Sequence, residues 1–445
     1  MKMNKYLIKD VAIVKHDGIS RSDIMISGER IEKISDSINP PNGCTEIDGS
    51  GLHAMPGLID DQVHFREPGL THKADIGSES RAAVAGGVTS FMEMPNTKPQ
   101  AVTKKLLEEK YSRAAEVSPA NYSFFMGTTN ENWEEAVSID PSKVCGIKVF
   151  MGSSTGNMLV DDPETLKKIF CNSPTLVAIH SETEEIIRKN EKEYFEKFGE
   201  DIPFSAHPEI RSREACIEST HKAIDIAEEC KTRLHILHIS TKEEAELFKK
   251  GHLKDKLITS EACVHHMYFD SSQYDKMGSL IKCNPAIKTA EDRDAILKAV
   301  LDDRIDIIAT DHAPHSWDEK QNKYMSAPSG LPLVQHSLNI LLDFYHRGLI
   351  TLEQIAYKAA KAPAELFRIK DRGEISEGSY ADIALVDLNK EWIVDKSNIL
   401  YKCGWSPLEG KTIKGSIEKT FVSGNLAWSD GKVADTRGKR LEFDY

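Results

Sequence analysis

The 445-residue sequence lacks the features that mark membrane, secreted or nucleic-acid-binding proteins. No stretch approaches the ~20 consecutive apolar residues that a helix needs to span a bilayer. The N-terminus, MKMNKYLIKDVAIV, has no apolar segment that ends in small residues, as a signal peptide would. The net charge of −13 argues against nucleic acid or an acidic membrane as the main partner. A small anionic substrate is compatible with this charge, because it needs only a local cationic pocket.

The eight cysteines contain no C-x-x-C pair. Several lie inside apolar runs such as SKVCGIKVF and SEACVHH, which predicts buried free thiols in a reducing compartment rather than a disulfide framework. Together with the missing signal peptide, this pattern predicts a cytoplasmic protein.

Both ends of the chain show short alternating strands with turn signals between them, as in YLIKDVAIV near the start and ADIALVDLN near the end. The simplest arrangement pairs the two ends in one small composite β-sandwich domain, because chain termini often lie close together. We predict that residues 1–54 and 375–445 form this domain and that residues 55–374 form the central one.

The central region alternates short apolar strands with helical segments, which is typical of a parallel sheet. Two helix starts are clear: Asp162 caps a helix with Pro163 in its first turn, and Ser240 with Glu243 matches a capping box. Eight strands over roughly 300 residues predict an α/β fold of the (β/α)8 TIM-barrel type. A doubly wound open sheet is the alternative.

Polar residues stand at the ends of most of these strands. In a (β/α)8 barrel the carboxyl ends of the strands meet at one mouth, where catalytic groups lie. In GLIDDQVHFREPG, residues two apart share a strand face, so Asp60, Gln62 and His64 should point the same way. The strand-end residues are His64, Arg66, Asn96, Lys148, His180, His238, Glu261 and Asp311.

A single strand-end histidine is more often a hydrogen-bonded core residue than a ligand. Here His64, His180 and His238 recur at matching positions of a repeating unit, together with Asp311 in TDHAPH. Imidazole and carboxylate groups suit Zn²⁺ and similar metals. The combined pattern therefore predicts a metal centre.

Lys148 in CGIKVFMGSSTG needs a separate explanation, because a protonated lysine would be repelled by two dications. A neutral lysine can react with carbon dioxide to form a carbamate, an anion with two oxygens that can bridge two metals. The alternative is an ordinary lysine paired with a carboxylate.

At these positions the sequence resembles the dihydroorotase branch of the amidohydrolase superfamily over essentially the whole chain. The resemblance is carried by PGLIDDQVHFREPGLTHK, GGVTSFMEMPNTKP, GIKVFMGSSTG, HILHIST and ATDHAPH. It implies a binuclear metal centre bridged by a carboxylated lysine, which falls on Lys148, and we expect one or two zinc ions per chain. His64 and Asp311 would belong to the first metal, and His180 and His238 to the second.

The resemblance also implies a reaction, the reversible closure of N-carbamoyl-L-aspartate to dihydroorotate by a metal-activated hydroxide. Asp311 would be its general acid and base. It assigns contacts with the substrate to Arg66, Asn96, Asn284 and His315. Arg66 offers a planar fork that matches a carboxylate.

The sequence departs from the superfamily pattern at one ligand. Members usually have Asp-x-His-x-His at the first strand, where this chain has Gln62 in place of the first histidine. An amide oxygen is a poorer zinc ligand than imidazole, so we expect the second metal to be held more firmly than the first. Gln62, Asp60 and Glu261 are left as outer-shell or uncertain ligands.

Three alternatives share much of this pattern. Allantoinases and dihydropyrimidinases act on cyclic amides without the substrate carboxylate, and FREPG with MPNT favours dihydroorotase over them. A catalytically silent partner protein typically loses several ligands, whereas only one of six is changed here. The expected partner is a small-molecule substrate, with no nucleic acid and no membrane, and the chain is a candidate homo-oligomer.

Overall fold

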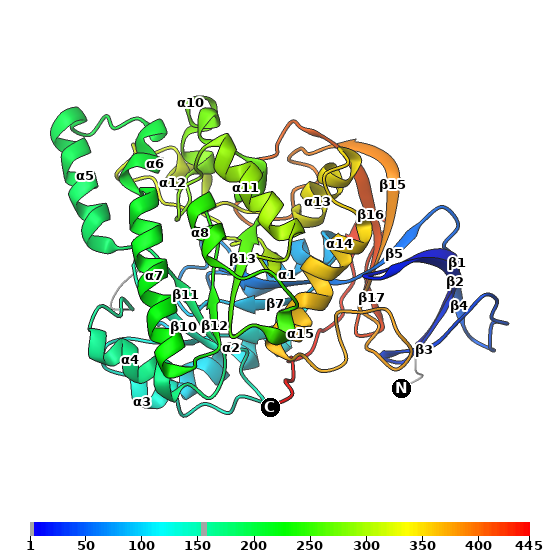
Figure 1. Cartoon of the computed structure of the whole chain (residues 1–445). Coiled ribbons are helices and arrows are strands. Elements are labelled where there is room, and N and C mark those ends of the chain that lie inside the picture. The colour runs from blue at the N-terminus through cyan, green and yellow to red at the C-terminus, as the bar shows by residue number, and fades with distance from the viewer. Residues whose placement is uncertain (1–3, 153–157) are drawn as a thin grey trace.

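The computed structural model describes residues 4–152 and 158–445, so residues 153–157, the last part of GIKVFMGSSTG and its following residue, lie outside the described residues. Strands and helices alternate in the middle of the chain, and the strands of the two chain ends lie together on one side (Figure 1). None of the helices in the described ranges combines the length and apolar composition that crossing a bilayer requires.

Eight parallel strands form a closed barrel, and one of the eight is divided into the two segments β8 and β9. One run has the order β14–β13–β12–β11–β10–β9, a second has the order β6–β7–β8, and β8 leads directly into β9 along the chain. The ring closes where Val63 and His312 form a parallel bridge and the His64 N–H donates to the His312 carbonyl at 2.7 Å. This closure confirms the barrel over the open sheet. The strands are β6 (Leu58–Val63), β7 (Val88–Glu93), β8 (Asn121–Phe124), β9 (Met126–Gly127), β10 (Ile147–Phe150), β11 (Val177–His180), β12 (Leu234–Ile236), β13 (Ile258–Cys263) and β14 (Ile307–Ala309).

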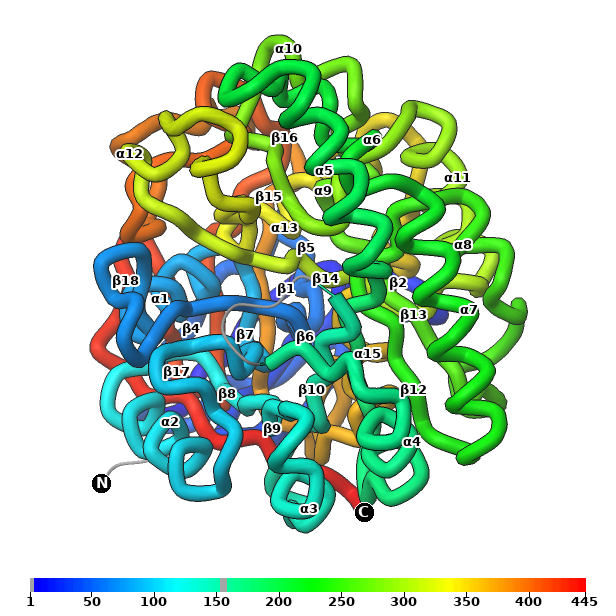
Figure 2. Tube along the Cα trace, turned by 90° about the vertical axis from the view of Figure 1, so that its left-hand side faces the viewer, coloured from blue at the N-terminus to red at the C-terminus, as the bar shows by residue number. Residues whose placement is uncertain are grey.

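Helices surround the barrel strands (Figure 2). Because both faces of the strands are covered, nearly every strand residue is buried, which explains the near-continuous apolar runs. The main covering helices are α1 (Ile76–Ala85), α2 (Lys104–Val117), α4 (Pro163–Asn172), α7 (Arg213–Cys230), α8 (Lys242–Leu247), α11 (Ala290–Leu301), α13 (Ser337–His346), α14 (Leu352–Ala356) and α15 (Ala362–Phe367). The remaining α-helices are α3 (Trp133–Ala136), α5 (Glu184–Phe198), α6 (His207–Ile210), α9 (Val264–Tyr268), α10 (Tyr274–Met277) and α12 (Trp317–Lys320).

One of the two predicted helix starts is confirmed. The Asp162 carboxylate accepts from the Thr165 N–H at 2.8 Å and caps α4. The cap of α8 is Thr241 instead of Ser240, and its hydroxyl accepts from the Glu244 N–H at 3.1 Å. The prediction was one residue early because Ser and Thr are both favoured caps and the two stand next to each other.

Strands from both chain ends form one nine-stranded sheet, which confirms the composite β-domain. Its order is β18–β17–β16–β15–β5–β1–β2–β3, with β4 paired to β1. Strand β5 spans the predicted boundary at residue 54, so that boundary stays a prediction. The strands are β1 (Lys5–Lys15), β2 (Gly18–Ser27), β3 (Arg30–Ser35), β4 (Thr45–Asp48), β5 (His53–Pro56), β15 (Ile383–Ile393), β16 (Thr412–Val422), β17 (Asn425–Ser429) and β18 (Lys432–Val433).

One pair of cysteines contradicts the prediction of free thiols. Cys171 at the end of α4 and Cys230 at the end of α7 form a disulfide, with Cα atoms 4.6 Å apart. The two residues are 59 positions apart in sequence, and only the packing of α4 against α7 brings them together. The other six cysteines are free, and four of them are buried.

A buried ion pair joins the barrel to the composite sheet. The Asp382 carboxylate, just before β15, accepts from Arg372, from the Ser423 N–H at 2.7 Å and from the Asn121 amide at 3.2 Å. The Asp382 and Arg372 side chains are each 3% exposed. We predict that Asp382→Asn lowers the free energy of unfolding by about 3 kcal/mol, because it leaves a buried guanidinium without its anion.

Urea denaturation followed by circular dichroism measures this effect. The matched control is Asp371→Asn, which breaks the exposed pair with Arg30 and should cost less than about 1 kcal/mol. Equal losses in the two variants would contradict the special role of the buried pair.

Candidate active site

The side chains predicted to meet at the strand ends line one cavity of about 300 Å³. Its walls come from the carboxyl ends of the barrel strands and from the loops that follow β13 and β14, where barrels of this kind place active sites. The predicted residues that line it are Gln62, His64, Arg66, Asn96, Lys148, His180, His238, Asn284, Asp311 and His315.

Two residues of the predicted set do not line the cavity. Asp60 accepts from the N–H and the hydroxyl of Thr310, because the pairing of β6 with β7 shifts register between Asp60 and Val63. The prediction that Asp60 shares a face with His64 is therefore wrong, since a register shift breaks the two-residue alternation. Glu261 lies deeper in the barrel, beside His235.

His180 and His238 face each other as two neutral imidazoles. His180 Nε2 donates to Glu182 at 2.8 Å, which directs His180 Nδ1 toward His238 Nε2 at 3.0 Å. Burial lowers the pKa of both histidines, that of His238 well below its usual range. Although burial alone would raise it, Arg211 and His180 hold the pKa of Glu182 well below its usual range. Neutral imidazoles oriented by a carboxylate are suited to binding a metal.

His64 and Asp311 form the second pair. His64 Nδ1 lies 2.7 Å from the Asn96 side-chain oxygen and donates to it, so His64 Nε2 is an acceptor. That Nε2 lies 3.1 Å from Asp311 Oδ1, another acceptor. Two acceptors this close require a proton or a cation between them, which is the arrangement that a metal ion would complete.

Lys148 stands among these groups with its Nζ 4.6 Å from the centre of the Phe150 ring, and no anionic partner for it occurs in the described part of the chain. No carboxylate of the described residues lies within ion-pair distance of its ammonium group, and the side chain is 1% exposed. Burial lowers the pKa of Lys148 to about 7, although Glu261, Asp311 and Asp61 oppose the shift. A substantial neutral fraction at pH 7 is what carbamate formation requires, and the alternative of a paired lysine finds no support.

The two donor pairs, with Lys148 near them, therefore fit a metal centre of two ions. His180 with His238 offers two imidazole nitrogens, and His64 with Asp311 offers one nitrogen and one carboxylate oxygen. Gln62 Nε2 donates to Asp311 at 3.2 Å, and its oxygen lies 3.7 Å from the Cys263 thiol. Gln62 therefore contacts Asp311, a candidate metal ligand, through its amide nitrogen.

Arg66 presents a cation to the same cavity. Its Nε donates to the Pro314 carbonyl at 3.0 Å, and one Nη lies 3.1 Å from His315. The residue is 8% exposed, and no carboxylate in the described part of the chain pairs with it. Burial lowers the pKa of Arg66 to about 10, so it stays charged at neutral pH. The buried side-chain oxygen of Asn284 also has no hydrogen-bond partner there.

Two supporting residues were missed by the sequence analysis. Glu182 follows His180 by two positions, so the two-residue period of a strand was a usable signal. Lys73 Nζ donates to His315 Nδ1 at 3.0 Å, which leaves His315 Nε2 to donate to the Ser329 carbonyl at 3.0 Å. Lys73 lies on a loop 242 residues away from His315, and nothing in the sequence pointed to this contact.

Two further buried groups of potential metal ligands occur in the described ranges: Cys263 with His265 and His266, and Asp61 with His235 and Glu261, of which only Glu261 was in the predicted set. The second group is an ion cluster. His235 Nε2 lies 3.5 Å from Asp61 and 3.4 Å from Glu261. Although burial opposes it, these carboxylates raise the pKa of His235 to about 9.

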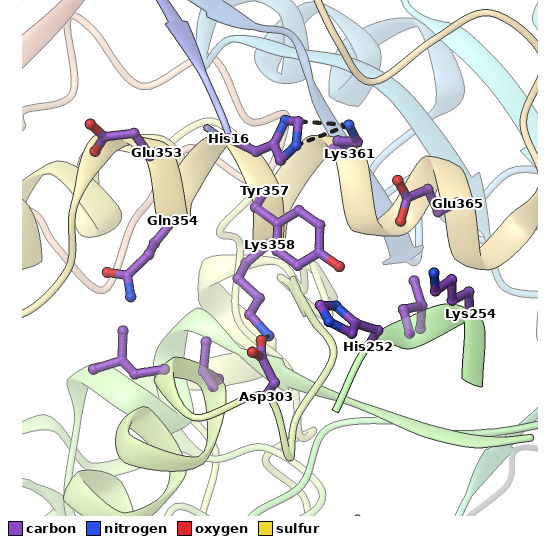
Figure 3. Close-up of a pocket in the computed structure, with 13 residues that line it drawn as sticks. His16, His252, Lys254, Asp303, Glu353, Gln354, Tyr357, Lys358, Lys361 and Glu365 are labelled. Carbon is purple, nitrogen blue, oxygen red and sulfur yellow. Dashed lines mark hydrogen bonds and ion pairs between the residues drawn. The ribbon is translucent and has the colours of Figure 1, made fainter. Parts of the chain in front are cut away.

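A second cavity, of about 480 Å³, lies at the opposite end of the barrel, beside residues that precede β13 and β14 (Figure 3). Lys358 pairs with Asp303 at 2.9 Å, and Lys361 contacts His16 and Glu374. No group of three potential metal ligands occurs there among the described residues. The ten predicted residues that line the first cavity are all absent from the lining of this second one.

The comparisons with known proteins agree with this geometry. The profile of the Amidohydrolase family matches residues 53–427, and the chain belongs to this family. Membership confirms the expected class of enzyme. A dihydroorotase from Halobacterium salinarum is 31% identical over 440 residues, 98% of this chain and 99% of that one. One from Pyrococcus furiosus is 32% identical over 395 residues, 88% and 85% of the two chains.

Other relatives carry different names. An allantoinase from Deinococcus radiodurans is 28% identical over 445 residues, 98% of each chain. The solved structure of an L-hydantoinase from Arthrobacter aurescens superposes with a TM-score of 0.93 at 24% identity, over 99% of this chain and 100% of that one. That structure supports the fold alone.

The His235 cluster generates a prediction about pH. A histidine whose pKa is higher in the folded than in the unfolded state contributes stability in full below about pH 6.5, and this contribution is lost as the pH rises through about 9. In metal-free protein, the free energy of unfolding from urea denaturation should fall across this interval. Asp61→Asn should lower the pKa of His235, measured by NMR of the ring protons.

Asp60→Asn is the control for this titration. Asp60 is next to Asp61 in sequence, but its carboxyl group faces Thr310. The substitution should leave the pKa of His235 nearly unchanged. A wild-type value at or below 6.5 would show that the carboxylates do not stabilise the imidazolium.

Proposed function

We propose that the chain is a dihydroorotase, which interconverts N-carbamoyl-L-aspartate and dihydroorotate. Arg66 is the observation that carries this proposal. It is a buried, charged guanidinium in the cavity wall, and the described residues give it no anionic partner. A buried cation is costly unless it is paired, so the cavity favours a substrate that brings a carboxylate.

The competing substrates differ in that one group. Dihydroorotate carries a carboxylate on its ring, whereas hydantoins, dihydropyrimidines and allantoin do not. The guanidinium can bind such a group through two parallel N–H donors, which adds orientation as well as attraction. Asn96, Asn284 and His315 line the same cavity and are proposed to contact the ring.

The residues that would hold two metal ions, proposed to be zinc, are His180 and His238 for one and His64 and Asp311 for the other. A carbamate on Lys148 would lie between them. Such ions supply Lewis-acid activation of the attacking water and of the amide carbonyl. The lowered pKa of Lys148 supports carbamate formation, in which the neutral amine bonds to carbon dioxide and loses a proton.

Asp311 is proposed to move the proton in both directions. In ring opening it takes a proton from the attacking water and passes it to the ring nitrogen as the C–N bond breaks. In ring closure the carbamoyl nitrogen of the substrate bonds to the carboxyl carbon and loses a proton to Asp311, which passes that proton to the oxygen that leaves as water when the C–O bond breaks. Gln62 holds Asp311 through an N–H donor on Oδ1, which fixes the carboxylate in the cavity without neutralising it.

Steady-state assays of the zinc-loaded protein test this function on dihydroorotate, dihydrouracil, hydantoin and allantoin. Wild type should prefer dihydroorotate. Arg66→Met should lower kcat/KM for dihydroorotate by roughly 10- to 100-fold, since a hydrogen bond to a charged group contributes about 1.5–3 kcal/mol. Asp311→Asn should remove nearly all turnover of every substrate.

Each other outcome has a distinct meaning. Faster turnover of hydantoin, dihydrouracil or allantoin would replace the proposed substrate. No turnover of any of them, with metal bound, would favour a catalytically silent protein. An unchanged kcat/KM in Arg66→Met would remove the argument from the carboxylate.

Metal removal tests the role of Gln62. We expect mild chelation to release one equivalent of zinc early from wild type, because the site of His64 and Asp311 lacks the second imidazole. Gln62→His should retain that equivalent longer, measured by elemental analysis after timed dialysis. Simultaneous release of both equivalents from both proteins would show that Gln62 does not set the affinity of the first site.

A further inference from the structure

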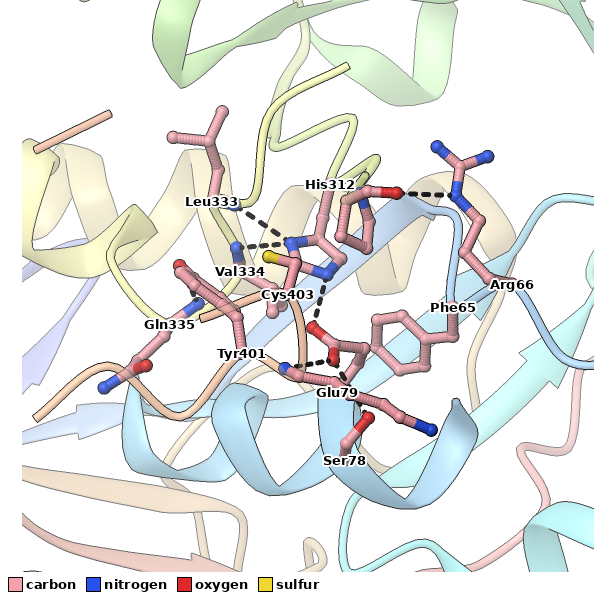
Figure 4. A network of polar contacts seen from close by, with 12 residues as sticks. Phe65, Arg66, Ser78, Glu79, His312, Leu333, Val334, Gln335, Tyr401 and Cys403 are labelled. Carbon is pink, nitrogen blue, oxygen red and sulfur yellow. Dashed lines mark hydrogen bonds and ion pairs between the residues drawn. The ribbon is translucent and has the colours of Figure 1, made fainter. Parts of the chain in front are cut away.

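The residue after Asp311 is held by a network of its own (Figure 4). His312 is completely buried, and its Nε2 lies 2.9 Å from the carboxylate of Glu79, which is also completely buried. Glu79 reaches the barrel from α1, far from the cavity wall in sequence. Neither residue lines the cavity, so neither touches the substrate.

The hydrogen bonds fix the tautomer of His312. Its Nδ1 accepts from the N–H groups of Leu333 at 2.9 Å and Val334 at 3.2 Å. The ring proton must therefore be on Nε2, where it is donated to Glu79. Glu79 in turn accepts on its other oxygen from the Ser78 hydroxyl at 2.9 Å and the Lys402 N–H at 3.0 Å. Every donor and acceptor of the pair is used.

This network fixes the chain on the carboxyl side of Asp311, whose backbone is strained. Asp311 has a φ of 46°, a left-handed conformation that costs roughly 1–3 kcal/mol in a non-glycine residue and persists only where the surroundings enforce it. On its amino side, the hydroxyl of Thr310 donates to Asp60 at 2.5 Å. On its carboxyl side, the ring of His312 is fixed by its three hydrogen bonds.

His312 also fixes His64, which forms the donor pair with Asp311. The His64 N–H donates to the His312 carbonyl at 2.7 Å, so a displacement of His312 would move both His64 and Asp311. The 3.1 Å approach of His64 Nε2 to Asp311 Oδ1 thus depends on the backbone position of His312.

We propose that Glu79 and His312 are a positioning pair, which holds Asp311 in its left-handed conformation at the correct distance from His64. The proposal rests on the proposed function, which assigns the proton transfer to Asp311. The pair acts only through Asp311 and His64. Its loss should therefore slow the chemical step while leaving the groups that bind the substrate carboxylate in place.

Glu79→Gln tests the pair with almost no change in volume. The glutamine oxygen can still accept from Ser78 and Lys402, but its NH2 group faces the Nε2–H of His312. His312 cannot move its proton to Nδ1, because two N–H groups face that atom. At saturating zinc we expect kcat for dihydroorotate to fall roughly 10- to 100-fold, the usual effect of removing a supporting partner, with KM changed less than about twofold.

Glu244→Gln is the matched control, since Glu244 is equally buried on a barrel helix and accepts only from residues outside the cavity. It should lose a similar amount of thermal stability and keep its kcat. Equal falls of kcat in the two variants, or none in Glu79→Gln, would overturn the pair.

A crystal structure of Glu79→Gln decides the question without any assay. We expect the Asp311 carboxylate to be displaced relative to His64. An Asp311 that stays in place with its φ unchanged would overturn the positioning pair. Wild type that turns over neither dihydroorotate nor N-carbamoyl-L-aspartate would overturn the proposed function, while the crystal structure would still judge the pair.

Discussion

The closure of the barrel between β6 and β14 is the constraint on which the rest of the site depends. The bridge between Val63 and His312, with the hydrogen bond from the His64 N–H to the His312 carbonyl, joins residues about 250 positions apart. Because the strands are parallel, their carboxyl ends meet on one side. His64 and Asp311 therefore lie 3.1 Å apart, and the groups on the intervening strands complete the ring around the same cavity.

The second organising feature is the balance of buried charge. Glu182 is paired with Arg211, and Glu93 is paired with Lys110 at 2.8 Å, so these carboxylates are compensated within the protein. Lys148 and Arg66 are not compensated in this way. Both are buried at the cavity without an anionic partner among the described residues. Burial lowers the pKa of both. A carbamate on one and a substrate carboxylate on the other would complete the balance, which links the fold to the proposed chemistry.

Much of this was accessible from the sequence. Parallel strands covered on both faces require near-continuous apolar runs, so the eight strands and the polar residues at their ends were recognisable. The errors came from features without a local pattern. Asp60 turned away from His64 because of a register shift, the cap of α8 is Thr241, and Cys171 is bonded to Cys230 through helix packing. None of these follows from residue spacing alone.

The sequence by itself determined the class of fold, the family and the residue types available for chemistry, because hydrophobic periodicity and motif spacing are local properties of the chain. The tertiary structure decided which nitrogen of each histidine is free, that Lys148 and Arg66 lack an anionic partner among the described residues, and that Glu79 is bonded to His312, the residue after Asp311. These are distances and burial between residues far apart in sequence. They are set only when the barrel closes, since closure removes water and fixes which groups must satisfy one another.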